Sequence, residues 1–375
     1  MILALSACGG GPLSNGGNQP PTPPPPASPA AFVYISSTSV STLTGISVAG
    51  GTPRQLTVSL PSPGGTAPVG MVATGRLLYI ANSGSGTISG FSFNANTGAL
   101  QQLPGSPTIA APGVNQLALC PGNGGPTAPR FLYAAAASAV LGYNITSTGQ
   151  LTPLPGSPRT AGTQPDAILT DPACNFVAVA NQGSNNISVF SVRSSDGFLT
   201  PVVGSPFAAG TGPVALAMGD GFLFAANSGS NNISVYTVNT GSGTGGFLTQ
   251  VPGSPFAAGS VPSALVYSST TLYVANSASS NVSAFAVTTQ TGFLNAVPGS
   301  PFTVGTQPKA MIAVSPPTNN LAQQLFLYVA NAGSNDLSGF TIGSNGVLTV
   351  VAGFPFPAGA NPQGLVFACG TCGYP

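Results

Sequence analysis

The sequence predicts an all-β protein, a seven-bladed β-propeller with four antiparallel strands in each blade. One segment, for example FVAVANQGSNNISVFSV, recurs with small changes at 77–93, 176–192, 222–238, 271–287 and 326–342. Each copy is followed by a turn, a short apolar run and a second shared segment, such as VPGSPFAAG at 251–259. A strand-rich repeat of roughly 45 to 54 residues is typical of a β-propeller.

Each repeat divides into four strands. In the clearest repeat we expect them at 166–170, 176–181, 187–192 and 198–203, with turns rich in Gly, Asn, Asp and Ser between the first three. Alternating apolar and polar residues indicate strands despite the high Gly and Pro content. The first strand of each repeat begins near Val69, Asn115, Asp166, Val214, Ser263, Lys309 or Gln363. Seven first strands indicate seven blades.

The two ends of the repeat region complement each other. Its first three strands, expected at 32–36, 43–48 and 54–59, have no inner strand before them, and the last strand, at 363–368, has nothing after it. A ring closes when both ends of the chain complete one blade, because no inner strand edge is then left unpaired. We therefore predict a closing blade of three N-terminal strands and one C-terminal strand.

Charged side chains are scarce. They make up 3% of the residues, as five Asp, five Arg and one Lys, without Glu or His, and the formal net charge is +1. Nucleic-acid binding and electrostatic attraction to an anionic membrane both depend on clustered positive charge, so the composition argues against both. No uninterrupted apolar run reaches the ~18 residues of a transmembrane helix.

The N-terminal region predicts export. Leu5-Ser6-Ala7-Cys8 resembles a bacterial lipobox, in which Cys8 would become the lipidated first residue of the mature protein. We expect a signal remnant at 1–8, a Gly- and Pro-rich spacer at 9–31 and the propeller at 32–375. Membrane contact would then be through the lipid at Cys8, at the bacterial cell envelope, either in the periplasm or on the surface. The alternative is a chance cysteine in an N-terminal tail.

The repeat resembles a known family. The pattern LYVAN-x-x-S-N-x-[IV]-S-[VAG]-[FY] with a following G-x-L, over nearly all of 32–368, is similar to the seven-bladed lactonase-like propellers, which include 6-phosphogluconolactonases and surface proteins with YVTN-type repeats. The resemblance implies catalysis by acidic, basic and His side chains at the mouth of a central channel. This chain has no His and no Glu, so a general base for lactone hydrolysis could only be an Asp.

Equivalent positions at the start of the seven inner strands should surround that mouth. Asp166 and Lys309 are the acid and the base among them, which makes Asp166 a candidate general base and Lys309 a candidate electrostatic clamp. Arg159, Asn115, Ser263 and Gln363 are candidate ligand-binding residues there. The alternative, which we favour, is that both charges are solvated or form a weak ion pair, because a usable base also needs a perturbed pKa and a positioned substrate.

Two further sets of residues recur in equivalent positions. An Asn ends the second strand of five repeats and is either part of a polar ring for glycans or a residue that shapes a turn; recurrence favours the turn. The PGSPF segment places Phe207, Phe256, Phe302 and Phe356 at the crossing to the next blade, where inter-blade packing is favoured over an exposed aromatic platform. Arg159 and Thr108 replace this Phe in two repeats.

The cysteines indicate an oxidising compartment. If Cys8 is lipidated, four remain: Cys120, Cys174, Cys369 and Cys372. Cys369 and Cys372 could pair locally, and Cys120 and Cys174, both near turns of neighbouring blades, could pair with each other. A redox or zinc role is disfavoured because the sequence has no thioredoxin-like βαβ context, no His and no second CxxC.

We expect a non-catalytic propeller that presents an uncharged disc for binding a protein or a glycan at the cell envelope. The alternatives are a lactonase-type hydrolase that uses Asp166 and Lys309, and a carbohydrate-binding module that uses polar loops. No phosphate-binding loop, G-x-S-x-G elbow, H-E-x-x-H pair or calcium-loop motif is present, so we expect no cofactor and no metal.

The scarcity of titratable groups leads to a prediction about pH. Few protons can differ between the folded and unfolded chains, so the free energy of unfolding should be nearly constant between about pH 4 and 8. Denaturant unfolding at several pH values measures this dependence. A change of several kcal/mol across that interval would contradict the prediction.

Overall fold

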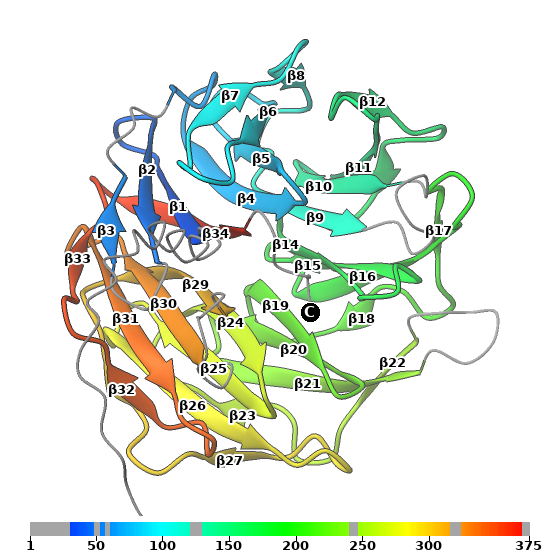
Figure 1. The fold of residues 1–375 in the computed structure, drawn as a ribbon. Coiled ribbons are helices and arrows are strands. Elements are labelled where there is room, and N and C mark those ends of the chain that lie inside the picture. The colour runs from blue at the N-terminus through cyan, green and yellow to red at the C-terminus, as the bar shows by residue number, and fades with distance from the viewer. Residues whose placement is uncertain are drawn as a thin grey trace, which may run out of the picture.

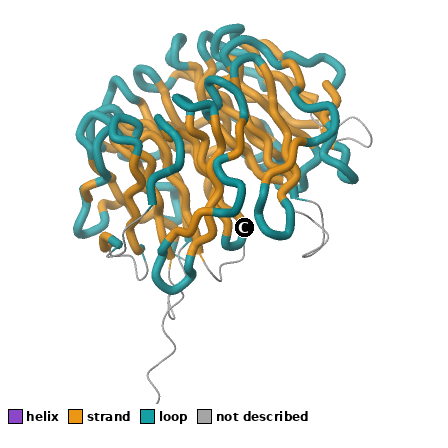
Figure 2. The backbone as a smooth tube through the Cα atoms, turned by 90° about the horizontal axis from the view of Figure 1, so that it is seen from above, coloured by secondary structure: helices purple, strands orange, loops and turns teal. Residues whose placement is uncertain are grey.

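The computed structural model describes residues 31–48, 53–56, 61–120, 130–239, 247–315 and 324–369. Their strands form seven antiparallel sheets placed around a central axis, and none of these residues is helical (Figure 1). None of them belongs to an apolar helix of membrane-spanning length. Figure 2 shows the strands side by side, with loops joining their ends. The seven-bladed β-propeller predicted from the repeat is confirmed.

The blades are numbered from the one that contains the first strand of the chain. The inner strands, in blades 2 to 7 and then blade 1, are β4 (Pro68–Thr74), β9 (Gln116–Cys120), β14 (Pro165–Thr170), β19 (Pro213–Gly219), β24 (Pro262–Ser268), β29 (Pro308–Val314) and β34 (Pro362–Cys369). The second strands, in blades 1 to 7, are β1 (Ala31–Ser37), β5 (Leu77–Asn82), β10 (Phe131–Ala136), β15 (Phe176–Asn181), β20 (Phe222–Asn227), β25 (Thr271–Asn276) and β30 (Leu325–Asn331).

The third strands are β2 (Thr42–Ser47), β6 (Thr87–Phe93), β11 (Ala139–Ile145), β16 (Asn186–Val192), β21 (Asn232–Asn239), β26 (Asn281–Val287) and β31 (Asp336–Ile342). The outer strands are β3 (Arg54–Gln55), β7 (Leu100–Gln102), β12 (Leu151–Pro153), β17 (Leu199–Pro201), β22 (Phe247–Gln250), β27 (Leu294–Ala296) and β32 (Leu348–Val350). A second outer segment follows in blades 2 to 7, as β8 (Thr108–Ile109), β13 (Arg159–Thr160), β18 (Phe207–Ala208), β23 (Phe256–Ala257), β28 (Phe302–Thr303) and β33 (Phe356–Pro357).

Blade 1 closes the ring as predicted. Its strand order is β3-β2-β1-β34, and β34 pairs with β1 from Ala31 opposite Cys369 to Ser37 opposite Pro362. Strands from the two ends of the propeller therefore lie in one sheet, and the inner edge of β1 is covered. The segments 1–8 and 9–30, which include Cys8 and nearly all of the expected spacer, lie outside the described residues.

The outer strand differs from the prediction because the PGSPF segment interrupts it. In blade 4, β17 and β18 both pair with β16, and the segment between them turns away from the sheet. The amide of Val189 in β16 then has no strand partner, and it donates to Ser205 Oγ of the PGSPF segment at 2.9 Å. The Phe of this segment thus begins a second piece of outer strand instead of lying in the crossing to the next blade. The same serine hydroxyl contact recurs in blades 2, 3, 5 and 6, where it replaces a missing ladder hydrogen bond.

The hydrophobic cores lie between blades. One cluster of buried side chains contains Phe224 and Val235 of blade 5 together with Leu265, Leu272 and Val274 of blade 6. Each blade therefore buries its apolar face only against its neighbours, which makes folding of the ring cooperative.

A tyrosine–glycine contact joins several neighbouring blades. Tyr133 lies opposite Gly142 in its own sheet, and its buried hydroxyl donates to the Gly197 carbonyl of the next blade at 2.7 Å. Gly197 has a φ of 71°, and a Cβ there would lie 2.8 Å from the Phe131 ring, so glycine is required. Equivalent bonds link Tyr34 to Gly98, Tyr79 to Gly149 and Tyr273 to Gly346.

The recurrent Asn side chains are structural. Asn181 is fully buried, donates to Asn186 Oδ1 at 2.8 Å and to Ser188 Oγ at 3.0 Å, and accepts from the Gly162 amide at 3.1 Å. The same position is fully buried in four other blades, at Asn82, Asn227, Asn276 and Asn331. Such side chains cannot form a surface ring for glycans; they fasten the second strand to the third.

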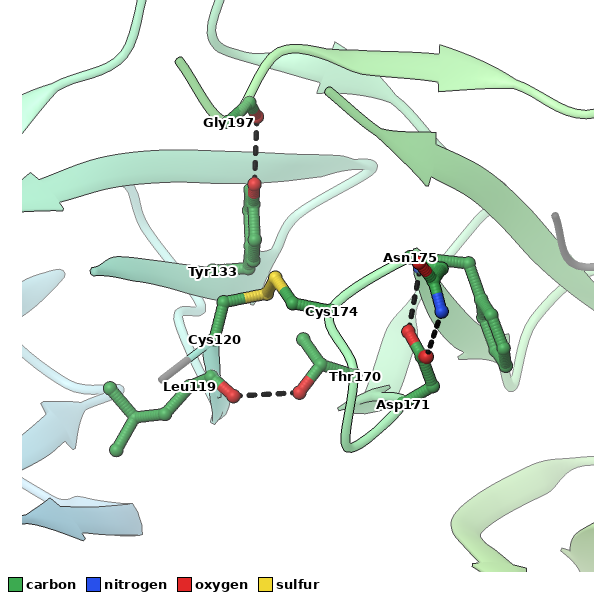
Figure 3. Close-up of a disulfide and its surroundings, with 9 residues drawn as sticks. Leu119, Cys120, Tyr133, Thr170, Asp171, Cys174, Asn175 and Gly197 are labelled. Carbon is green, nitrogen blue, oxygen red and sulfur yellow. Dashed lines mark hydrogen bonds between the residues drawn. A yellow bond between two sulfur atoms is a disulfide. The ribbon is translucent and has the colours of Figure 1, made fainter. Parts of the chain in front are cut away.

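A disulfide crosses the boundary between blades 3 and 4. It joins Cys120, at the end of β9, to Cys174, in the turn that follows β14, with their Cα atoms 5.3 Å apart (Figure 3). Beside it, the Thr170 hydroxyl donates to the Leu119 carbonyl across the same boundary at 2.7 Å. Cys369 is also disulfide-bonded, and Cys372 lies outside the described residues.

Removing this disulfide should lower stability. The cross-link spans 54 residues and restricts the unfolded chain, so the double substitution Cys120→Ser and Cys174→Ser should cost about 2–4 kcal/mol of the free energy of unfolding. Urea unfolding of the variant and the oxidised wild type measures the difference. Equal unfolding midpoints of the two proteins would show that the disulfide does not contribute to stability.

Candidate functional site

Backbone bulges lie near the start of most inner strands. Between the pairs Pro165–Asn181 and Ala167–Ala180, Asp166 has no partner residue on β15. Val214, Ser263 and Lys309 are inserted in the same way in the next three blades, and Gln363 in blade 1. A bulge turns a side chain out of the regular alternation and is common beside functional sites. We call these positions, together with Val69 and Asn115, the axial ring, because they begin the strands nearest the axis (Figure 1).

Asn115 and Asp166 are the two residues of the axial ring whose side chains bond to each other. Asn115 Nδ2 donates to Asp166 Oδ1 at 3.0 Å and to the Pro165 carbonyl at 3.2 Å. The Asn115 backbone is also held, because its amide donates to the Ala135 carbonyl at 3.0 Å and its carbonyl accepts from Gly70 at 2.9 Å. A Cβ at Gly70 would lie 2.4 Å from that carbonyl, so this approach of blade 2 needs glycine. Asn115 thus connects three blades and fixes the Asp166 carboxylate.

The environment of Asp166 raises the pKa of its carboxyl group. Burial is the largest cause, because the charged form loses hydration; the hydrogen bond from Asn115 and the positive charge of Lys309 act in the opposite direction and are weaker. Lys309 is exposed and belongs to blade 7, three blades beyond Asp166. The ion pair found among the described residues is Arg193–Asp196, so Asp166 and Lys309 interact at longer range.

The other predicted site residues have different surroundings. Ser263 Oγ donates to the Pro308 carbonyl of the next blade at 2.7 Å, and Gln363 Nε2 donates to Asn361 Oδ1 at 2.8 Å. Both therefore lie in the axial ring but contact neither Asp166 nor Asn115 through a hydrogen bond. Their oxygen atoms keep acceptor capacity.

Arg159 does not lie in the axial ring, which corrects the prediction. It belongs to β13, which pairs with β11, so two strands, β11 and β10, separate it from the inner strand β9 of its blade. Its guanidinium carbon lies 4.0 Å from the centre of the Phe198 ring in blade 4, and that of Arg193 lies 4.8 Å from the same ring. The negative face of the aromatic ring attracts the guanidinium group, so Arg159 packs between blades instead of facing Asp166.

This arrangement can support proton transfer. A carboxylate with a raised pKa, oriented by an amide, has the properties of a general base. Among the described residues, no three His, Cys, Asp or Glu side chains gather as a metal ion requires. The sequence identified Asp166 and Asn115 separately, but their contact and the buried, unpartnered Oδ1 of Asn115 depend on how blades 3 and 4 meet.

The chain belongs to the lactonase family of seven-bladed β-propellers. The family model matches residues 127–217 and 222–368, more than half of the chain. This membership defines the class of protein, and the family resemblance stated from the repeat is confirmed. No curated protein matches the chain.

Several solved structures have a similar fold. A candidate 6-phosphogluconolactonase from Bacteroides fragilis is 17% identical with a TM-score of 0.72, over 92% of this chain and 100% of the other. A second, from Bacteroides uniformis, is 16% identical with a TM-score of 0.71, over 91% and 100%. The periplasmic gluconolactonase PpgL of Pseudomonas aeruginosa is 16% identical with a TM-score of 0.70, over 90% and 99%. At these identities the likeness concerns the fold alone.

The raised pKa of Asp166 has a testable effect on stability. The folded protein binds the proton of this carboxyl group more tightly than the unfolded chain, so the contribution of Asp166 to stability falls as pH rises from its unfolded pKa, near 4, through its higher folded pKa. The Asn side chain that replaces Asp166 does not titrate, and its Oδ1 can still accept the hydrogen bond from Asn115 Nδ2. The unfolding free energy of Asp166→Asn minus that of the wild type should therefore increase from pH 3 to pH 7, as measured by urea unfolding.

A difference between the two proteins that stays constant or decreases over this range would contradict the raised pKa. The control for the Asp-to-Asn change itself is the variant Asp336→Asn, which lies outside the axial ring. Asn already occupies the equivalent position in three other blades, at Asn186, Asn232 and Asn281.

Proposed function

We propose that the protein is a lactonase-type hydrolase that acts at the axial ring. The observation that carries this proposal is a single carboxylate, Asp166, which is bulged out of an inner strand, held by Asn115 and shifted in pKa by burial. Membership of the lactonase family supports the reaction class, as do the relatives that are named as lactonases. In a chain without His or Glu, this is the group with the properties of a general base.

In the proposed reaction, Asp166 accepts a proton from a water molecule whose oxygen attacks the lactone carbonyl. The ring C–O bond then breaks, and the proton passes to the departing ring oxygen, so the products are a hydroxy acid and the regenerated carboxylate. The positive charge of Lys309, which acts on Asp166 across the ring, favours the negative charge that develops on the carbonyl oxygen. Asn115 keeps the carboxylate in place.

A second candidate is a non-catalytic propeller that binds a protein or glycan. The scarcity of charged groups favours it, since 3% of the residues are charged and none is His or Glu. A carbohydrate-binding module would have to use exposed polar loop residues, because the recurrent Asn side chains are buried. These candidates predict no hydrolysis of lactones.

We also propose that the protein is exported and anchored by a lipid at Cys8. The lipobox resemblance at residues 5–8 motivates this proposal, and the disulfide between Cys120 and Cys174 supports it, because disulfides persist in oxidising compartments. Lipid attachment at Cys8 would place the propeller at the cell envelope. Mass spectrometry of the protein from membranes of its host tests for the lipid.

A lactone hydrolysis assay separates these candidates. The wild type should accelerate opening of an aldonolactone such as δ-gluconolactone above the rate in buffer, and Asp166→Asn should lose about 10²–10⁴-fold of this activity because it lacks the base. Asp336→Asn, which reproduces the residue of other blades, should keep full activity. Activity is followed by the acid released at constant pH.

Each outcome decides between the proposals. A wild-type protein without activity on lactones would favour the non-catalytic propeller. Full activity of the Asp166→Asn variant would remove Asp166 from the mechanism while leaving the reaction class in place.

A further inference from the structure

A cavity opens between blades 2 and 3, away from the axial ring. Its volume is about 240 Å³, and its walls come from the PGSPF-equivalent segment of blade 2 (104–108) and the turn before β12 of blade 3. Tyr79 and Leu103, which are both buried, also line it. None of the axial-ring residues lines it, so it is a separate site.

The same location in other blades is filled by a phenyl ring. In blade 5, Phe256 meets Phe293 of blade 6 edge to face, with ring centres 5.0 Å apart, and a Cβ on Gly253 would lie 3.8 Å from the Phe256 ring. In blade 6, a Cβ on Gly299 would lie 3.6 Å from the Phe302 ring. The Phe of the PGSPF segment thus covers the preceding Gly and fills the space at the blade boundary.

Blade 2 lacks this ring. Thr108 occupies the Phe position and Gln150 occupies the position of Phe293, so two aromatic side chains are replaced by two smaller or more flexible polar ones. At Gly105, the side chain within reach of a Cβ is that of Gln150, 3.3 Å away. The cavity is therefore the volume that a phenyl ring occupies elsewhere in this protein.

Blade 3 provides an internal comparison. There the Phe is replaced by Arg159, whose guanidinium covers Phe198 at 4.0 Å, and the cavity left at that boundary is about 10 Å³. Loss of the Phe therefore does not by itself open a large cavity. The cavity at Thr108 exists because neither partner at that boundary is large.

The walls of the cavity combine apolar and polar groups and carry no charge. No Asp, Arg or Lys lines it, and burial raises the pKa of Tyr79, whose hydroxyl donates to Gly149, so this side chain stays neutral. Gln150 Nε2 donates to the Pro104 carbonyl at 3.0 Å, which leaves its Oε1 as an acceptor. In the described part of the chain, the Thr108 hydroxyl makes no hydrogen bond within the protein. The cavity offers no side chain of opposite charge to a charged ligand, whereas its apolar and polar groups match a neutral ring with a hydroxyl group.

We propose that this cavity binds a small, uncharged phenolic molecule. Its ring takes the place that the phenyl ring of Phe256 has in blade 5, and its hydroxyl group bonds to Thr108 Oγ1 and Gln150 Oε1. This proposal does not depend on lactone hydrolysis, because the two sites share no residue.

Binding of p-cresol to the full-length protein tests the proposal. The wild type should bind p-cresol with a Kd on the order of 1 mM or tighter, measured by calorimetry or by ligand-observed NMR. Thr108→Phe should weaken binding at least tenfold because it restores the ring of the other blades. Thr303→Phe, the same substitution at an exposed residue of blade 6 that does not line the cavity, should leave the Kd unchanged.

Gln150→Phe closes the cavity from the opposite wall and should have the same effect as Thr108→Phe, so the test survives if one of these variants does not fold. Absence of p-cresol binding to the wild type would overturn the proposal. So would unchanged binding in both cavity-closing variants, or binding of methyl glucoside at this site without binding of p-cresol.

Discussion

The packing of each blade against the next is the constraint on which the rest of the structure depends. No sheet buries its apolar side chains within itself, and the clusters of buried residues all bridge neighbouring blades, as for Phe224 and Leu265. The Tyr133 hydroxyl and the Gly197 carbonyl meet across one such boundary, with the glycine in a conformation that admits the ring beside it. Closure by β34 beside β1 gives every blade two neighbours, and the ring is stable as a unit for this reason.

The boundaries between blades are built from equivalent positions of the repeat, so a boundary that is packed differently identifies the residues that depart from the repeat. Between blades 5 and 6 two phenyl rings meet, between blades 3 and 4 an arginine covers a phenyl ring, and between blades 2 and 3 a cavity remains. The open volume beside Thr108 is the difference on which the proposed binding of a phenolic molecule rests. The exceptional residues, Thr108 and Arg159, are those that interrupt the repeat.

The axial ring differs from the blade boundaries in what determines its side chains. Bulges near the start of most inner strands free a residue from pairing, and most of these side chains are uncharged, as with Val214 and Ser263. Asp166 is the exception whose environment alters its proton affinity, because burial outweighs the hydrogen bond from Asn115 and the charge of Lys309. A propeller with so few titratable groups has few ways to do acid–base chemistry, and this carboxylate is the one that supports a catalytic role for the fold.

The sequence by itself determined the number of blades, the strand order and the closure, because these depend on local patterns that repeat along the chain. Strand alternation, Gly- and Asn-rich turns and the absence of an inner strand before 32–36 are all readable without knowing which blades touch. The pairing of Cys120 with Cys174 was one of the possibilities that it left open.

Only the tertiary structure determined the contacts and the cavity between blades. The contact of Asn115 with Asp166, the position of Arg159 on Phe198 and the cavity beside Thr108 each join residues from two repeats. Spacing within one repeat carries no information about these contacts, since they depend on the distance and rotation between neighbouring sheets. The interrupted outer strand was missed for a related reason: the Ser205 hydroxyl replaces a ladder bond, and that substitution is visible only when β16 and the segment beside it are in place.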